Sequence, residues 1–233
     1  QFSADYYDID VKKRITPLGA QRLVDECVSG TSPLFCNQIV RNAGTGLIER
    51  VDDRQVNAAA GVTGGVDIEL RYDMEPDFFA SQNENLRLRL FANHMLENSV
   101  TTTVYRDDVG SLTSPEWNAT ATLGYDIGNW GINWVTRYYD STNYTLGFGV
   151  HWRSGFEVDD ATIASQTVNN MSVSYRGETN SGANWVASFN VNNIFDRDPP
   201  IVASQNLRGG QQGVSNVFDV FGRRYQVSLN YSF

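Results

Sequence analysis

The sequence predicts an all-β chain of about eight antiparallel strands, and three observations lead to this prediction. Apolar and polar residues alternate over segments of about ten residues, as they do in strands, where successive side chains point to opposite faces. Stretches rich in Gly, Asn, Asp, Pro and Ser separate these segments. Long and short connections follow one another in turn along the chain. Its 233 residues are enough for one large β domain.

The first strand-like segment covers residues 2–11, and an irregular stretch, residues 12–46, follows it. Within that stretch, residues 18–27 have the composition of a short helix. Cys27 and Cys36 lie too far apart for a CxxC redox motif, and no histidine nearby completes a zinc site. We predict a disulfide between them, which would indicate an oxidising compartment, and two free thiols are the alternative.

The middle of the chain alternates cleanly in six further segments, which are residues 62–72, 86–96, 117–125, 130–138, 167–176 and 185–191. In each, one face is mainly apolar and the other carries Asn, Thr, Ser or charged residues. His94 falls on the apolar face of its segment, near the end. These six segments are therefore predicted to be half-buried strands.

The last segment, residues 222–233, gives the clearest pattern. Polar residues occupy one face, and the other face carries Tyr225, Val227, Leu229, Tyr231 and Phe233. A face of this kind packs on a core in a soluble sheet or on lipid in a membrane barrel, and the alternation alone does not choose between them. In the membrane interpretation this segment is a membrane-insertion strand.

The connections favour the membrane interpretation. Residues 12–46, 100–115, 140–164 and 196–221 form long loops, whereas residues 75–85, 127–129 and 177–183 form shorter turns. Long loops therefore lie at one end of the predicted sheet and short turns at the other. Outer-membrane barrels have this asymmetry, while soluble sandwiches and lipocalin-like barrels have no systematic reason for it. Aromatic residues also gather near the predicted strand ends, either as interfacial girdles or through ordinary strand enrichment.

Charged side chains lie in the middle of several predicted strands, on the polar face: Asp67, Glu69, Arg71, Arg87, Arg89 and Arg137. An unpaired buried charge costs several kcal/mol, so these residues indicate a wide, wet or plugged lumen rather than a small filled barrel. Arg71, Arg87 and Arg89 are candidate contacts for an anionic ligand. In the alternative interpretation they pair with Asp67, Glu69 and Asp73 across neighbouring strands, or with a plug in the lumen.

The predicted loops offer two further sets of candidates. Carboxylates are the ligands that hard divalent cations prefer, which makes four loop residues candidate ligands of a structural divalent cation: Asp107, Asp108, Asp159 and Asp160. No ordered ligand spacing supports this, and a solvated loop surface is the alternative. Tyr144, Trp152 and Phe156 are candidates for stacking on a sugar or an aromatic ligand, or for packing within the loop.

Composition and motifs exclude several functions. The net charge of −9 argues against nucleic acid as a partner. No apolar run approaches the roughly 18 residues of a spanning helix. His94 and His151 lie far apart and have no nucleophile motif beside them, so we predict no enzymatic activity and no cofactor.

Five segments together resemble one family. These are DYYDIDVKKRI (residues 5–15), the cysteine-bearing loop (residues 23–36), GGVDIELRY (residues 64–72), NNIFDRDPP (residues 192–200) and the terminal GRRYQVSLNYSF (residues 222–233). In order and spacing they resemble the C-terminal part of a TonB-dependent outer-membrane receptor. The loop cysteine pair is similar to one seen in many proteobacterial members.

The resemblance implies a barrel of about 22 strands with a plug in its lumen, of which residues 1–233 would be the C-terminal part. It also implies active uptake of a scarce solute, either an iron-siderophore or an oligosaccharide, at the bacterial outer membrane. The implied partners are lipid and lipopolysaccharide, the solute, and the TonB motor acting through the plug. Three alternatives remain: a complete eight-stranded anchor or adhesin barrel, a soluble sandwich that acts as a binding module, and a receptor-fold subunit working with partner surface proteins.

Overall fold

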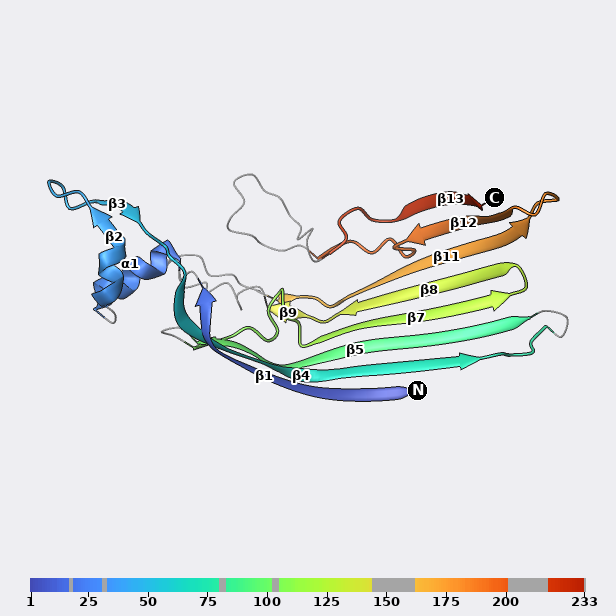
Figure 1. Cartoon of the computed structure of the whole chain (residues 1–233), viewed down its shortest axis with the longest axis horizontal. Helices are drawn as coiled ribbons and strands as arrows, with labels where there is room; N and C mark the ends of the chain where they lie inside the picture. The colour runs from blue at the N-terminus through green and yellow to red at the C-terminus, as the bar shows by residue number, and fades with distance from the viewer. Residues whose placement is uncertain are drawn as a thin grey trace. The chain divides into compact units, whose positions relative to one another are not determined.

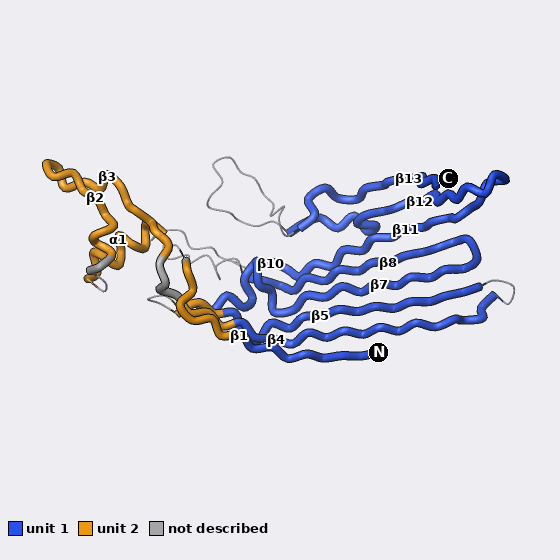
Figure 2. The backbone as a smooth tube through the Cα atoms, in the orientation of Figure 1, with its two compact units in different colours: residues 1–8, 63–98, 107–233 blue, residues 9–62, 99–106 orange. Residues whose placement is uncertain are grey.

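The structure of the chain is a computed structural model, which describes residues 1–16, 19–30, 33–79, 83–101, 105–143, 162–200 and 218–232. The fold of these residues is all-β apart from one α-helix and one 3-10 helix. The chain divides into two compact units (Figure 2). The first comprises residues 1–8, 63–98 and 107–233, and the second comprises residues 9–62 and 99–106.

Eight strands lie side by side in the main sheet (Figure 1). In spatial order they are β1 (Phe2–Thr16), β4 (Val56–Met74), β5 (Glu84–Thr101), β7 (Trp117–Ile127), β8 (Trp130–Tyr139), β11 (Gln166–Glu178), β12 (Asn184–Asn192) and β13 (Arg224–Ser232). A short strand, β6 (Tyr105–Asp107), also pairs with β5. The pairs from β5 to β13 are antiparallel, which confirms the predicted strands and their direction. Among the described residues the sheet stays open, with β1 and β13 at opposite edges.

The register puts apolar and polar side chains in alternate rows across the sheet. One row is apolar throughout: Leu86, Tyr125, Ile132, Val173, Phe189 and Val227. The next row carries polar residues and glycine: Arg87, Gly124, Asn133, Ser172, Asn190 and Gln226. Since successive residues of a strand point to opposite sides, the sheet has one apolar face and one polar face. The apolar face is open, and Val227 and Leu229 on β13 keep 78% and 69% of their surface exposed.

The connections alternate as predicted. Residues 75–83, 128–129 and 179–183 join β4 to β5, β7 to β8 and β11 to β12, and they are the short ones. The connections that follow β5, β8 and β12 are all longer. An all-β antiparallel sheet with one apolar face and this asymmetry has the architecture of a membrane β-barrel wall.

Aromatic side chains meet at the short-turn end of the apolar face. The rings of Trp130 and Tyr175 make an edge contact at 4.8 Å, and Tyr175 lies 5.6 Å from Trp185. Towards the long-loop end His94 stacks on Trp117 at 4.1 Å, in keeping with its predicted place near the end of its strand. Both ends of the apolar face therefore carry aromatic clusters, as the girdle interpretation expects.

The second unit contains α1 (Ala20–Ser29), the 3-10 helix η1 (Pro33–Gln38), and a hairpin of β2 (Ile39–Arg41) and β3 (Ile48–Val51). A disulfide joins Cys27 to Cys36, with 5.0 Å between their Cα atoms, which confirms the predicted pair. Leu23 is 1% exposed and gives this unit a buried apolar residue. A disulfide that closes so short a loop typically stabilises the fold by about 2–3 kcal/mol.

Two boundaries differ from those expected from the sequence. The helix begins at Ala20 and runs to Ser29, because Gly30 has a positive φ of 75° and ends it. β1 continues beyond residue 11 to Thr16, within a stretch that the sequence assigns to a loop, because β4 pairs with it. None of the described helices is long and apolar enough to span a membrane.

Candidate functional site

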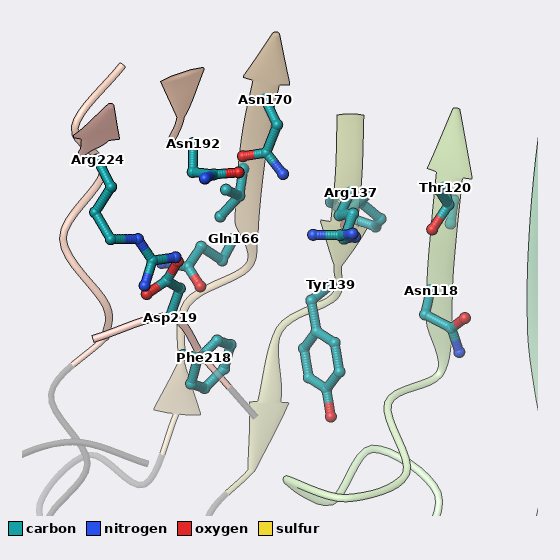
Figure 3. A pocket seen from close by; sticks show the side chains of 13 residues that line it. Asn118, Thr120, Arg137, Tyr139, Gln166, Asn170, Asn192, Phe218, Asp219 and Arg224 are labelled. Atoms are coloured by element: carbon teal, nitrogen blue, oxygen red, sulfur yellow. The ribbon is translucent and has the colours of Figure 1, made fainter. Parts of the chain in front are cut away.

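A cavity of about 430 Å³ lies on the polar face of the sheet, towards the end where the long loops leave it (Figure 3). We call it the wall cavity. Its lining residues come from β7, β8, β11, β12, the first residue of β13 and the segment before it: Asn118, Ala119, Thr120, Arg137, Tyr138, Tyr139, Gln166, Val168, Asn170, Asn192, Phe218, Asp219 and Arg224. All of them belong to the first unit.

The strand register explains why these side chains meet. Asn118 pairs with Tyr139, and Tyr139 pairs with Gln166, so one row crosses three strands. Two residues further towards the short turns, a second row consists of Thr120, Arg137 and Val168. Because rows two residues apart share a face, residues distant in sequence build one wall.

A second hollow of about 340 Å³ adjoins the wall cavity towards the short turns. It shares Asn170 and Asn192 with the wall cavity and adds Asn133, Asn190 and Gln226. Together the two hollows form a polar strip that carries seven carboxamide side chains: Asn118, Gln166, Asn170, Asn192, Asn133, Asn190 and Gln226. Carboxamides both donate and accept hydrogen bonds, so this strip offers neutral hydrogen-bonding groups of both kinds.

The two arginines of the wall cavity differ in their partners. The guanidinium of Arg224 is ion-paired with Asp219 and lies 5.2 Å from the centre of the Phe221 ring. In Figure 3 it reaches towards Asp219 and Gln166. Arg137 makes no ion pair or hydrogen bond with any residue in the described part of the chain. Within the described part of the chain, Arg137 therefore supplies a positive charge to the cavity that no carboxylate compensates.

Two of the carboxamides are held in a fixed orientation. The Oδ1 of Asn170 accepts a hydrogen bond of 2.8 Å from the backbone N–H of Asn193, so its Nδ2 is left as a donor. The Nε2 of Gln166 donates to the backbone carbonyl of Asp198 at 3.1 Å, which leaves its Oε1 as an acceptor. Side chains anchored in this way lose less freedom when a ligand binds.

An aromatic pair closes the cavity at the long-loop end. The Phe218 ring, 5% exposed, makes an edge contact with Tyr139 at 5.4 Å between ring centres. The hydroxyl of Tyr139 donates to the backbone carbonyl of Leu112, which fixes its ring. A concave surface with rigid aromatic edges and a few directed polar groups has the character of a small-solute site.

Comparison with protein-family models gives one family. Residues 1–194 match the model described as TonB dependent receptor-like, beta-barrel. The chain belongs to this family. The comparison with curated proteins and the comparison with solved structures gave no significant match.

The family match confirms the resemblance seen in the sequence and makes the chain a barrel portion of a TonB-dependent receptor. Such receptors act in the outer membrane and are transporters rather than enzymes. The apolar face is therefore the lipid face, and the polar face that carries the wall cavity is the lumen face.

The three arginines predicted as ligand contacts do not line the receptor's wall cavity. The Nε of Arg71 donates to Glu69 at 2.7 Å, a pair within β4 and not across neighbouring strands as the alternative interpretation expected. Arg87 pairs with Asp126 instead of the acidic residues of β4, and Asp126 also binds Arg176 at 3.1 Å. Arg89 makes no ion pair or hydrogen bond to another described residue.

The structure describes only some of the loop residues that the sequence predicts as ligand contacts. Tyr144, Trp152, Phe156, Asp159 and Asp160 lie outside the described residues, as does Phe233. The carboxylate of Asp107 accepts the backbone N–H of Val109 at 3.0 Å, an interaction within its own turn. Within the described residues, no three His, Cys, Asp or Glu side chains lie close enough together to hold a metal ion. The cation hypothesis at Asp107 and Asp108 thus gains no support there.

The NIFD motif, residues 193–196, follows β12 and is hydrogen-bonded to the residue that precedes β13. Asp196 accepts the backbone N–H of Arg223 at 2.8 Å, and its carboxylate also lies 3.2 Å from the Arg223 guanidinium. Gly222 has a φ of 68°, and a Cβ there would lie 3.3 Å from the Asp196 carboxylate, so the approach favours glycine. The hydrogen bond from the Arg223 backbone, with the Arg223 charge, holds the pKa of Asp196 below its usual range.

Asp196→Asn is expected to weaken this connection in a pH-dependent way. The lowered pKa means that the carboxylate stabilises the fold above the ordinary aspartate value of about 3.9, and this contribution is lost as the pH falls through the folded pKa. The variant should therefore have a lower free energy of unfolding than the parent at pH 7, with the difference shrinking on acidification. Denaturant titrations of the full-length receptor at several pH values measure this. Asp198→Asn is the matched control, and an equal effect of both substitutions would contradict the prediction.

Proposed function

We propose that this barrel portion belongs to a TonB-dependent active uptake receptor, which holds a small solute on its lumen wall and outer loops. The solute is an iron-siderophore or an oligosaccharide. The observation that carries the proposal is the wall cavity, which opens on the polar face and lies near the long loops. The lumen face of an outer-membrane receptor is the surface that a solute meets as it passes through.

The open edges of the sheet support a larger barrel. β1 and β13 lie at opposite edges, whereas a complete eight-stranded barrel requires its first and last strands to pair. Unpaired strand edges are costly in lipid, because no water satisfies their backbone groups. Further strands of a barrel of about 22, with a plug in its lumen, would cover both edges. The described strands also form one sheet with an open apolar face, unlike the two packed sheets of a soluble sandwich.

The mechanism follows from the division of roles between the two faces. The lipid face anchors the wall, and the lumen face binds the solute. Binding energy selects the solute. The TonB motor would act on the plug and supply the energy that moves the solute through the barrel. Nothing in this scheme requires a catalytic residue or a cofactor.

Deletion of the gene tests the proposal. We expect the deletion strain to lose uptake of either a ferric chelate or an oligosaccharide, measured with radiolabelled solutes. A plasmid copy of the full-length gene should restore uptake in a strain with TonB and fail to restore it in a strain without TonB. Restoration independent of TonB would refute active uptake and favour a passive or anchoring role.

A further inference from the structure

We propose that the wall cavity binds an acidic oligosaccharide, with one carboxylate of the sugar chain on Arg137 and its hydroxyls on the carboxamide strip. This inference rests on the proposed uptake function and names the chemical class of its solute. It is argued from the groups that line the polar strip.

The carboxamides favour a solute rich in hydroxyl groups. A hydroxyl both donates and accepts hydrogen bonds, and so does a carboxamide. Seven carboxamides lie along the two adjoining hollows, and Asn192 and Thr120 make no side-chain hydrogen bond with other described residues. A chain of sugar units offers hydroxyls along its whole length, matching a strip rather than a single point.

The anchored carboxamides present opposite hydrogen-bonding ends. Asn170 offers its Nδ2 as a donor, and Gln166 offers its Oε1 as an acceptor, because their other ends are bonded to the backbone of residues 193 and 198. Gln166 and Asn170 lie four residues apart on β11, so hydroxyls on different units of a sugar chain can satisfy one of each. A ligand with acceptors only, such as a multiply charged anion, would leave the Gln166 oxygen without a donor.

The charge of the wall cavity favours one carboxylate over several. Arg224 is neutralised by Asp219, whereas Arg137 has no ionic partner among the described residues. A guanidinium binds a carboxylate through two parallel hydrogen bonds, and such charge-assisted bonds are stronger than neutral ones. A ferric chelate with several negative charges would find, in the lining of the wall cavity, one arginine without an ionic partner among the described residues.

The aromatic end of the cavity suits a sugar ring. Tyr139 is held by its bond to Leu112 and by the Phe218 ring, so its position is fixed. A pyranose carries C–H groups on one face, which pack on an aromatic surface without a polar partner. The wall cavity of about 430 Å³ therefore combines an apolar edge, four of the seven carboxamides and one arginine without an ionic partner among the described residues.

The test measures binding by the full-length receptor in detergent, without TonB. The probes are tri-galacturonate and its carboxyl-reduced analogue, which keeps the hydroxyls and lacks the charges. We expect Arg137→Gln to weaken tri-galacturonate binding at least about tenfold, the range of a charged hydrogen bond, and to leave binding of the reduced analogue within about twofold. Arg14→Gln is the matched control, because Arg14 is exposed, does not line the cavity and, like Arg137, makes no ion pair with another described residue. It should change neither affinity.

Three outcomes would overturn the inference. Arg137→Gln could bind both probes as tightly as the parent, or it could lose both equally. The parent receptor could also bind neither probe while TonB-dependent uptake of a ferric chelate persists, in which case the uptake function stands and the sugar class is wrong. Folding of each variant is checked by heat-modifiable migration, and Asn192→Ala gives a second test, since it should weaken both probes alike.

Discussion

Leu229→Arg is expected to prevent stable insertion of the receptor in the outer membrane. Leu229 lies near the middle of β13 on the lipid face, where it pairs with Ala187 and 69% of its surface is exposed. An arginine on the lipid face of a barrel costs about 2–4 kcal/mol near the bilayer midplane. The amount of folded, heat-modifiable receptor in purified outer membranes measures the effect.

The adjacent residue provides the control. Asn230 lies on the same strand but points to the lumen face, in the row of Val186, so Asn230→Arg adds the same charge to the wet side. We expect near-normal insertion for Asn230→Arg. If Leu229→Arg inserted as well as Asn230→Arg, the assignment of the two faces would be wrong.

Strand positions and faces could be predicted from the sequence because each depends on local alternation. Val227 and Leu229 share a face whatever their partners are, and polar residues fall between them. The extra length of β1, up to Thr16, could not be predicted in this way. Residues 12–16 carry charged side chains and alternate poorly, and they are extended because β4 supplies their hydrogen bonds.

The site was harder to predict because it depends on register. Arg87 could be assigned to the polar face, but its partner Asp126 comes from another strand and is fixed only by the pairing of β5 with β7. The sequence places Arg137 on the inward face, yet nothing in it says that this arginine has no ionic partner among the described residues. The run of Asn and Gln on the polar faces of β8, β11, β12 and β13 was the available signal for the wall cavity.

The glycine pair at the start of GGVDIELRY also has contacts that depend on strand register and that the sequence does not reveal. The sequence places Gly64 and Gly65 on opposite faces of β4 but does not say which one needs to be glycine. In the structure, the Tyr7 side chain on β1 reaches across β4 to β5. Its hydroxyl accepts a hydrogen bond of 3.0 Å from the Nδ2 of Asn93, which also donates to Asp67 at 2.7 Å. Gly65 lies beneath this hydroxyl.

Gly65→Ala is therefore expected to destabilise the receptor. A Cβ at Gly65 would lie 2.6 Å from the backbone carbonyl oxygen of His94 and 2.6 Å from the hydroxyl of Tyr7, closer than real Cβ contacts. The carbonyl belongs to the sheet and has little freedom to move, so β4 and β5 would have to shift and the bond between Tyr7 and Asn93 would be lost. Overpacking of this kind costs about 1–3 kcal/mol, which denaturant titration of the full-length receptor would measure.

Gly64→Ala is the matched control, because a Cβ there meets nothing closer than the Tyr7 carbonyl oxygen at 3.4 Å, an ordinary contact. We expect it to unfold at the same denaturant concentration as the parent. Tyr7→Ala combined with Gly65→Ala separates the two contacts. The double variant should stay destabilised, because the His94 carbonyl remains in place. Full recovery in the double variant would mean that the Tyr7 ring alone requires glycine at Gly65, and that the spacing between β4 and β5 can adjust.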